Sequence, residues 1–395
     1  MIKSSSKNAV TIGIICIATY MVNYYLRNLL SVMTPALLAS GNYTEAHIGL
    51  LSSTYMVLYA AGQLVNGILG DRLSPKKMVL IGIITASVAT VAFPLTPYPA
   101  VQFAYFAALG FGLSMLRGPL MKIISENTEP NQARTICVFF SFASFAGPLV
   151  ASLFAMASNW VWGYLFAGII AVAAAIAVFI GLNALEHKGV ITYRSSKGEG
   201  FGALVSVFKI EKFGFYMVIA CLVEIAGASV SFWIPTYLTD GLSFEKDTAN
   251  FIFSGISTCR SFMPFLSLAI FRAINERDVP MMRVSFGISS LFFVCMLFAP
   301  NRYVSILFLL LALMAMSCTS ALLWSIYIPS LGKTGKVSSV NGILDCTGYI
   351  AAALANLLFA NVMANVGWNT VFVLWASLGV IGITATLFVR NKKSA

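Results

Sequence analysis

The sequence predicts an all-α integral membrane protein with twelve transmembrane helices in two pseudo-symmetric six-helix bundles. Three observations support this fold class: the composition, long segments without charged residues, and a repeat between the two halves of the chain. Hydrophobic residues make up 59% of the 395 residues and charged residues only 10%. Soluble domains contain roughly a quarter charged residues, so this composition excludes a cytosolic enzyme, a nucleic-acid-binding protein and a secreted disulfide-rich scaffold.

Four long segments carry no Asp, Glu, Lys or Arg, and they cover 78–116, 135–185, 303–332 and 346–389. A helix needs about 20 apolar residues to cross a bilayer, so the longer segments each hold two spans. The breaks between these spans are visible as PLTPYP at 94–99, SNW at 158–160 and GWN at 367–369. A transmembrane β-barrel would instead show short segments of alternating polarity.

Boundaries placed at these breaks and at charge clusters give twelve spans. Those of the first half are 8–33 (after Lys7), 44–70 (before Asp71), 77–97 (ending in the proline break), 100–124 (after it), 133–157 (ending at the SNW break) and 160–185 (before Glu186). Those of the second half are 213–238 (after Lys212), 247–272 (ending at Arg272), 279–299 (after Asp278), 302–330 (before Lys333), 336–363 (before the GWN break) and 366–389 (before Arg390).

A long polar connection, residues 186–212, separates the first six spans from the last six. It predicts an N-terminal bundle over 1–185 and a C-terminal bundle over 213–395. The halves also resemble each other, because ART at 133–135 and GKV at 335–337 each place a basic residue just before a helix rich in small residues. Paired six-helix halves are typical of transporters whose site lies at the midplane between them.

The net charge of +11 is distributed unevenly along the chain. Most Lys and Arg residues fall at the termini and in the loops that follow even-numbered spans, among them Arg72, Lys76, Lys77 and Lys122, whereas only Lys246 and Arg302 fall in the opposite loops. This asymmetry is the positive-inside pattern. It predicts a multi-pass protein of the cell membrane, the inner membrane of a bacterium, with both termini in the cytoplasm and no role in nucleic-acid binding.

Residues 67–77 (GILGDRLSPKK) resemble the signature between the second and third helices of the major facilitator superfamily, and 143–148 (ASFAGP) is similar to its fifth-helix motif. The resemblance implies the major facilitator fold and a monomeric transporter that works by alternating access between its two bundles. It also implies that Gly70, Asp71 and Arg72 are gating residues, whose ion pairs and helix-end contacts hold one access state.

The first predicted span is similar to that of organophosphate:phosphate antiporters, in YYLRN at 24–28 followed by Ser31. WIPTYL at 233–238 resembles the end of their seventh helix. This resemblance implies that Arg27 is one member of the phosphate-clamping arginine pair of that family. The corresponding position for the second member is Gly227 in this chain.

Apart from charges near the span ends, five charged residues fall inside predicted spans, and they are Arg27, Arg117, Glu224, Arg260 and Asp345. A charge at the bilayer centre costs at least about 2.5 kcal/mol on insertion scales. Such residues therefore either form structural ion pairs or face a hydrated path. Polar residues spaced by three or four favour a hydrated path, with Tyr20, Asn23, Tyr24, Arg27, Ser31 and Thr34 on the first span and Ser52, Tyr55, Tyr59, Gln63 and Asn66 on the second.

Three arginines and no lysine inside the spans favour an anionic substrate, since the guanidinium fork suits carboxylate or phosphate. We expect Arg27 and Arg260 to clamp the substrate, with Tyr24, Asn23 and Tyr59 orienting it. Arg117 is a further candidate contact, or it extends to the lipid headgroups. Two carboxylates, Glu224 and Asp345, are candidates for proton coupling, for neutralising arginines in the empty site, or for binding a substrate amine.

The sequence thus predicts a secondary active transporter of a small organic anion, phosphorylated or carboxylated, by antiport or proton symport. Protons or inorganic phosphate are the candidate coupling ions. The alternatives are proton-coupled efflux of cationic or drug-like compounds through Glu224 and Asp345, and a membrane sensor built on a transporter scaffold. No enzyme, cofactor or metal site is predicted, because the chain has no GxxxxGK[ST] or HExxH motif and its seven cysteines are spread over the spans.

Overall fold

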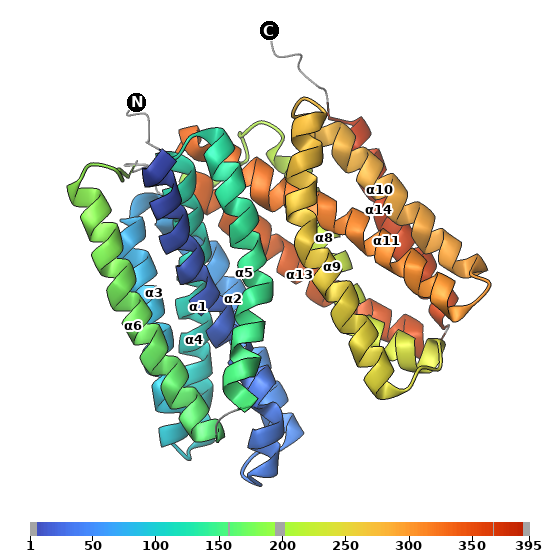
Figure 1. The fold of residues 1–395 in the computed structure, drawn as a ribbon, viewed down its shortest axis with the longest axis horizontal. Coiled ribbons are helices and arrows are strands. Elements are labelled where there is room, and N and C mark those ends of the chain that lie inside the picture. Colours follow the sequence, from blue (N-terminus) through green and yellow to red (C-terminus); the bar gives the residue numbers. More distant parts are fainter. Residues whose placement is uncertain (1–5, 157–158, 194–201, 366, 390–395) are drawn as a thin grey trace. The chain divides into compact units, whose positions relative to one another are not determined.

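The computed structural model describes residues 6–156, 159–193, 202–365 and 367–389, and every regular element in these ranges is helical (Figure 1). The predicted spans of the first half correspond to α1 (Ser6–Ala39), α2 (Glu45–Arg72), α3 (Pro75–Ala92) with η1 (Phe93–Leu95), α4 (Pro99–Asn127), α5 (Pro130–Met156) and α6 (Trp160–His187). A short helix, α7 (Gly202–Val207), lies in the predicted linker, of which residues 194–201 are outside the described ranges.

The predicted spans of the second half also correspond to helices. They are α8 (Phe213–Thr236) with η2 (Tyr237–Gly241), α9 (Lys246–Ala273), α10 (Asp278–Cys295) with η3 (Met296–Phe298), α11 (Arg302–Ala321) with η4 (Leu322–Tyr327) and α12 (Ile328–Ser330), then η5 (Leu331–Thr334), α13 (Val337–Asn365) and α14 (Trp368–Leu387). Both η2 and η4 are π-helical. The tenth span therefore changes its helical pitch before α12 begins.

Local sequence signals explain where several helices begin. Thr44 caps α2 because its side chain accepts a hydrogen bond from the backbone N–H of His47 at 3.2 Å. The side chains of Asn159 and Asn301 cap α6 and α11 in the same way. Such caps satisfy N–H groups that have no partner inside the helix. Pro75 and Pro99 stand at the first positions of α3 and α4, where a missing N–H does no harm.

The chain divides into two compact units. Unit 1 comprises the described residues of Met1–Val207 together with Ile328–Cys346, and unit 2 comprises those of Phe208–Tyr327 and Thr347–Ala395. In unit 1, α4 packs against α2 and α3, α5 against α1, and α6 against α3; in unit 2, α10 packs against α11 and α14. Residues 328–346 belong by sequence to the second half of the chain but pack within unit 1, which the sequence does not indicate. The predicted division into bundles 1–185 and 213–395 stays a prediction.

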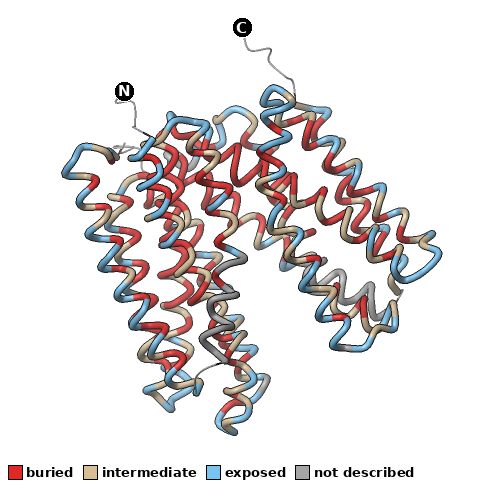
Figure 2. Tube along the Cα trace, viewed as in Figure 1, coloured by how far each residue is buried: buried red, intermediate tan, exposed pale blue. Residues whose placement is uncertain are grey.

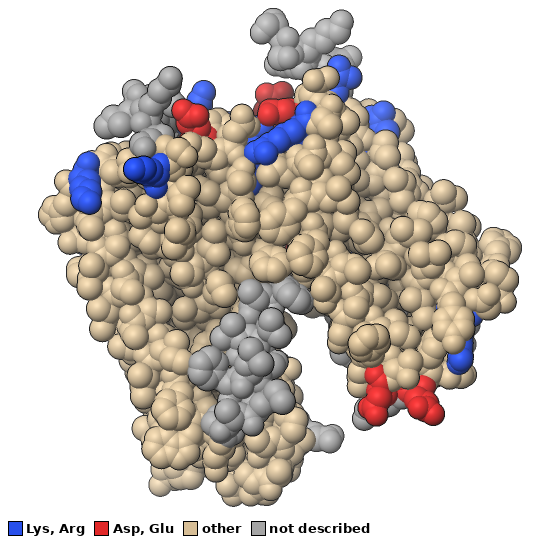
Figure 3. Space-filling view, viewed as in Figure 1, with Lys and Arg blue, Asp and Glu red and all other residues tan. Residues whose placement is uncertain are grey.

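Besides an apolar core, both units expose large apolar side chains and bury polar ones. Ile14 and Val88 in unit 1 and Val284 in unit 2 are more than half exposed, whereas Asn23, Ser87 and Ser289 of the same helices are buried. Buried and exposed residues alternate along the helices (Figure 2). On the visible face, the described Lys, Arg, Asp and Glu residues gather at the helix ends (Figure 3). Within the described residues, nine helices are long and apolar enough to cross a membrane. Two helical segments of α8 and η2, Phe213–Ala228 and Trp233–Gly241, meet at a bend and together make a tenth span. This pattern suits a protein surrounded by lipid.

Candidate functional site

A cluster of predicted site residues forms where α1 meets α2. The Arg27 guanidinium carbon lies 5.7 Å from the centre of the Tyr24 ring and 5.0 Å from that of Tyr59. The Tyr59 ring in turn stacks on Tyr55, with the ring centres 5.7 Å apart. Cation–π attraction of this kind holds a guanidinium in an apolar environment without neutralising its charge. Three predicted substrate-binding residues, Arg27, Tyr24 and Tyr59, are therefore adjacent in unit 1.

Asn23, the fourth predicted residue on this helix face, lies one turn from Arg27 and is 1% exposed. Neither of its amide atoms has a hydrogen-bond partner among the described residues. On α2, the amide nitrogen of Gln63 also has no hydrogen-bond partner among the described residues, and Gln63 is 1% exposed. Buried polar groups without partners are rare in folded proteins, so these two amides need an explanation.

Arg117 and Asp345 form an ion pair in unit 1. The distance between Arg117 Nη1 and Asp345 Oδ1 is 2.6 Å, and the side chains are 13% and 1% exposed. The amide nitrogen of Asn341 donates to the other carboxylate oxygen of Asp345 at 2.8 Å. Arg27 also lies within electrostatic range of Asp345. Geometry of this quality is required before the attraction in a buried pair offsets the loss of hydration.

The other two intramembrane charges, Arg260 and Glu224, lie in unit 2. Arg260 of α9 donates from Nε to the Ser317 hydroxyl of α11 at 3.3 Å. Glu224 of α8 lies against Gly348 of α13, where an added Cβ atom would stand 2.6 Å from the Glu224 Cγ. Both residues are half-buried.

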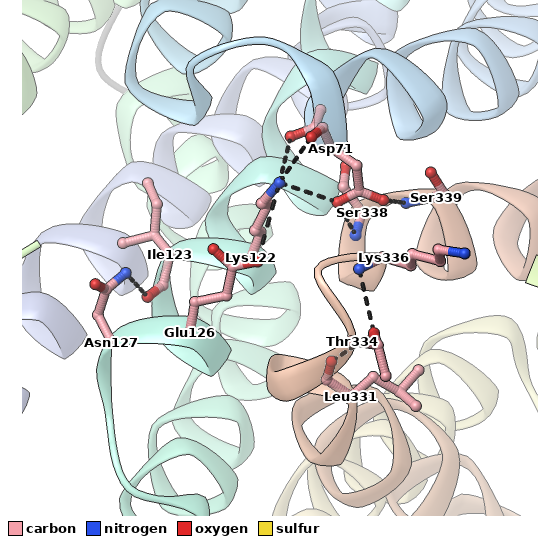
Figure 4. Close-up of polar contacts among 11 residues, drawn as sticks. Asp71, Lys122, Ile123, Glu126, Asn127, Leu331, Thr334, Lys336, Ser338 and Ser339 are labelled. Carbon is pink, nitrogen blue, oxygen red and sulfur yellow. Dashed lines mark hydrogen bonds and ion pairs between the residues drawn. The ribbon is translucent and has the colours of Figure 1, made fainter. Parts of the chain in front are cut away.

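A second polar cluster surrounds Asp71 at the end of α2 (Figure 4). The Asp71 carboxylate accepts hydrogen bonds from the backbone N–H groups of Ser338 at 3.1 Å and Ser339 at 2.7 Å, in the first turn of α13. These N–H groups have no acceptor within their helix, and the positive end of the helix dipole favours an anion there. The predicted gating residue Asp71 thus fastens the beginning of α13 to α2.

Lys122 completes this cluster and was not among the predicted site residues. Its Nζ lies 3.3 Å from Asp71 Oδ1 and 3.9 Å from Glu126 Oε1, and it donates to the backbone carbonyl of Asp71 at 3.1 Å. The side chain is 1% exposed. From the sequence, Lys122 was predicted to be one of the cytoplasmic loop charges. Its spacing of four residues from Glu126 is the signal that could have shown a buried pair.

The other two predicted gating residues lie next to Asp71. Gly70 sits under the Ser338 side chain, and a Cβ atom at Gly70 would stand 2.1 Å from the Ser338 hydroxyl. Only glycine permits this approach. Arg72, the last residue of α2, is half-buried. The described residues contain no group of three His, Cys, Asp or Glu side chains that could hold a metal ion.

Comparisons with known proteins agree with this geometry. A family model described as Major Facilitator Superfamily matches residues 16–353. A phosphoglycerate transporter protein of Salmonella typhimurium is 23% identical over 88% of this chain and 82% of its own length. The membrane sensor protein UhpC of the same organism is 23% identical over 58% of this chain, and the match spans only 57% of the relative. These relatives support the organophosphate-type resemblance of the first and seventh spans.

The fold is shared with the solved structure of the transporter FucP in its outward conformation, with a TM-score of 0.78 at 14% identity over 98% of this chain and 100% of the FucP chain. At this identity the likeness concerns the fold alone. The predicted all-α membrane fold is thereby confirmed. Because the family model matches most of the chain, this protein belongs to the Major Facilitator Superfamily, a family of membrane transporters and not of enzymes.

Proposed function

We propose that the protein is a secondary active transporter that moves a small organic anion, phosphorylated or carboxylated, by alternating access. The observation that carries this proposal is Arg27, a guanidinium within the first span that lies between two tyrosine rings. Asp345 pairs with Arg117, and the three intramembrane charges predicted for unit 1, Arg27, Arg117 and Asp345, sum to one positive charge. A positive charge in low dielectric favours an anionic ligand. The similarity to a phosphoglycerate transporter protein supports the same substrate class.

Unit 2 supplies the remaining parts of the proposed mechanism. Arg260 is the second arginine of the clamp, and Glu224 balances its charge or carries the coupled proton in a symport cycle. Antiport against inorganic phosphate is the other proposed mode. From the distribution of basic residues we also propose an inner-membrane protein with cytoplasmic termini, acting as a monomer. Intramembrane ionisable residues mark substrate and proton paths in other transporters.

The first test replaces each clamp arginine by lysine, which keeps the charge but removes the planar fork. We expect Arg27→Lys and Arg260→Lys to reduce anion counterflow in proteoliposomes by at least about tenfold, since a charge-assisted hydrogen bond contributes about 1.5–3 kcal/mol. Arg302→Lys is the matched control, because Arg302 is exposed and lies over the ring of Phe244. Wild-type counterflow in both clamp variants would refute the proposal.

Asp71 gives a second test, of the gating role. Asp71→Asn keeps the size of the side chain but turns one acceptor facing an N–H group into a donor. It also removes the charge that lies 3.3 Å from the buried Lys122 Nζ. The loss of these charge-assisted contacts, about 1.5–3 kcal/mol each, weakens the state in which residues 328–346 are docked. We expect counterflow to slow by roughly tenfold or more, while the substrate Kd from thermal shift stays near that of the wild type. Exposed Asp240→Asn serves as control. A raised Kd with an unchanged rate at saturation would contradict the gating role.

A ligand-sensing protein is the second candidate, because the relative UhpC is named as a membrane sensor. The same proteoliposomes separate the two functions. A transporter exchanges the anion that stabilises it, whereas a sensor binds the anion without counterflow.

A further inference from the structure

We infer that Asn23 and Gln63 recognise a hydroxyl group of the substrate beside the anionic group held at Arg27. The transported anion would then be hydroxylated, as sugar acids and polyol phosphates are, and not a simple alkyl carboxylate or phosphate. The inference rests on the proposed function and specifies the substrate class further.

The first observation is a contrast among the fully buried amide side chains. Five of them are found in the described residues, all in unit 1. The amide nitrogen of Asn66 donates to the Ser114 hydroxyl at 2.7 Å, that of Gln102 to the Tyr43 hydroxyl at 3.0 Å, and that of Asn341 to Asp345 at 2.8 Å. In Asn23 and Gln63 the amide nitrogen has no acceptor among the described residues. The nitrogens of three amides therefore serve the fold, although the oxygens of these three have no partner among the described residues, whereas the nitrogens of Asn23 and Gln63 are unused by it.

The second observation is the position of the two unused amides. Arg27 lies over the Tyr59 ring at 5.0 Å, which sets α1 and α2 at the same level there. Asn23 precedes Arg27 by one helical turn, and Gln63 follows Tyr59 by one turn. Consecutive spans run in opposite directions, so one turn back along α1 and one turn forward along α2 lead the same way. Asn23 and Gln63 therefore lie on the same side of Arg27. Residues one turn apart are about 5–6 Å apart between Cβ atoms, so both amides lie within one small molecule's length of the guanidinium.

The chemistry of Asn23 selects the ligand group. Its amide nitrogen needs an acceptor and its amide oxygen needs a donor. An ionised carboxylate or phosphate offers acceptors only, whereas a hydroxyl offers both an acceptor and a donor. A hydroxylated anion satisfies both atoms of this amide, and an unsubstituted one leaves its oxygen buried and unpaired.

The experiment compares anions of equal charge with and without hydroxyl groups. The pairs are glycerol 3-phosphate with propyl phosphate, and glycerate with propionate. Binding to the full-length protein in detergent is measured by thermal shift, and exchange is measured by counterflow. We expect the wild type to prefer one hydroxylated member by at least about 100-fold, since a site built to bond a hydroxyl strongly rejects the analogue that lacks it. Asn23→Leu and Gln63→Leu should remove most of this preference while the unsubstituted anion still binds.

Asn66→Leu is the matched control, because Asn66 is a buried amide on α2, like Gln63, but its nitrogen already donates to the Ser114 hydroxyl. It should lower the melting temperature without ligand and leave the hydroxyl preference unchanged. Asn23→Leu should leave the ligand-free melting temperature unchanged or raise it, because it removes an unpaired polar group.

Two results would overturn this inference without affecting the proposed function. One is equal affinity of the wild type for both members of each pair, and the other is an unchanged preference in Asn23→Leu and Gln63→Leu. Either result would leave anion transport standing, provided that binding still depends on Arg27. If no anion of the panel binds, the proposed function and this inference fail together.

Discussion

Replacing Asp345 by Asn is expected to lower the free energy of unfolding by about 3–5 kcal/mol, the range found when one partner of a buried ion pair is removed. The substitution leaves the Arg117 guanidinium, 13% exposed, without its carboxylate at 2.6 Å. It also turns one acceptor of the Arg117 and Asn341 hydrogen bonds into a donor. The measurement is the unfolding midpoint of the purified protein in detergent, followed by counterflow of any variant that folds.

A double substitution separates the ion pair from other effects. In Arg117→Leu with Asp345→Leu, both charges are gone, so the stability should return close to that of the wild type, whereas each single change to Leu destabilises. Glu245→Gln, which alters an exposed acid of unit 2, is the control and should change nothing. If the double variant lost as much stability as the two single variants together, the Arg117–Asp345 interaction would be contradicted. Restored stability without counterflow would assign the pair a role in transport as well as in folding.

Gly342→Ala is expected to slow transport by about 5- to 150-fold, although it adds a single methyl group. A Cβ atom at Gly342 would stand 2.2 Å from the backbone oxygen of Gln63 and 2.7 Å from the Cα atom of Gly67. Backbone atoms cannot yield as a flexible side chain does, so α13 must move away from α2. Overpacking of this kind costs typically about 1–3 kcal/mol, which corresponds to a shift of about 5- to 150-fold in a two-state equilibrium.

Hydrogen exchange of residues 337–346 measures this displacement directly. We expect faster exchange there in Gly342→Ala, together with the slower counterflow. The same substitution on α2, Gly49→Ala, is the control, because no atom lies within 4 Å of the added Cβ. Wild-type exchange and counterflow in Gly342→Ala would show that the docking of residues 328–346 in unit 1 plays no part in the cycle.

The sequence predicts the spans of this protein well, because the signal that defines a span is local. A bilayer requires about 20 apolar residues per helix, and the breaks at 94–99 and 158–160 interrupt the apolar segments directly. Observed helices such as α6 (Trp160–His187) accordingly begin and end close to the predicted bounds. Charged residues within spans are equally visible, because burying a charge is costly wherever it occurs.

The role of Lys122 was not predicted, because the burial of a charge at a span end depends on its neighbours in space. A lysine near the end of a span is ordinarily a headgroup or loop residue, and only the approach of Asp71 and Glu126 makes this one a buried partner. The docking of residues 328–346 in unit 1 was also not indicated, since it depends on glycines of two distant helices meeting at Gly67 and Gly342.

By itself, the sequence determined that this protein is a twelve-span membrane transporter with five ionisable residues inside its spans, because hydropathy and the energy of burying charge act on each segment alone. Only the tertiary structure decided which of these residues are neighbours. Arg117 and Asp345 are 228 residues apart in the chain and 2.6 Å apart in space, while Arg27 lies between tyrosine rings. Whether a buried charge meets a counter-charge or an aromatic ring depends on how distant helices pack, and no local pattern carries that information.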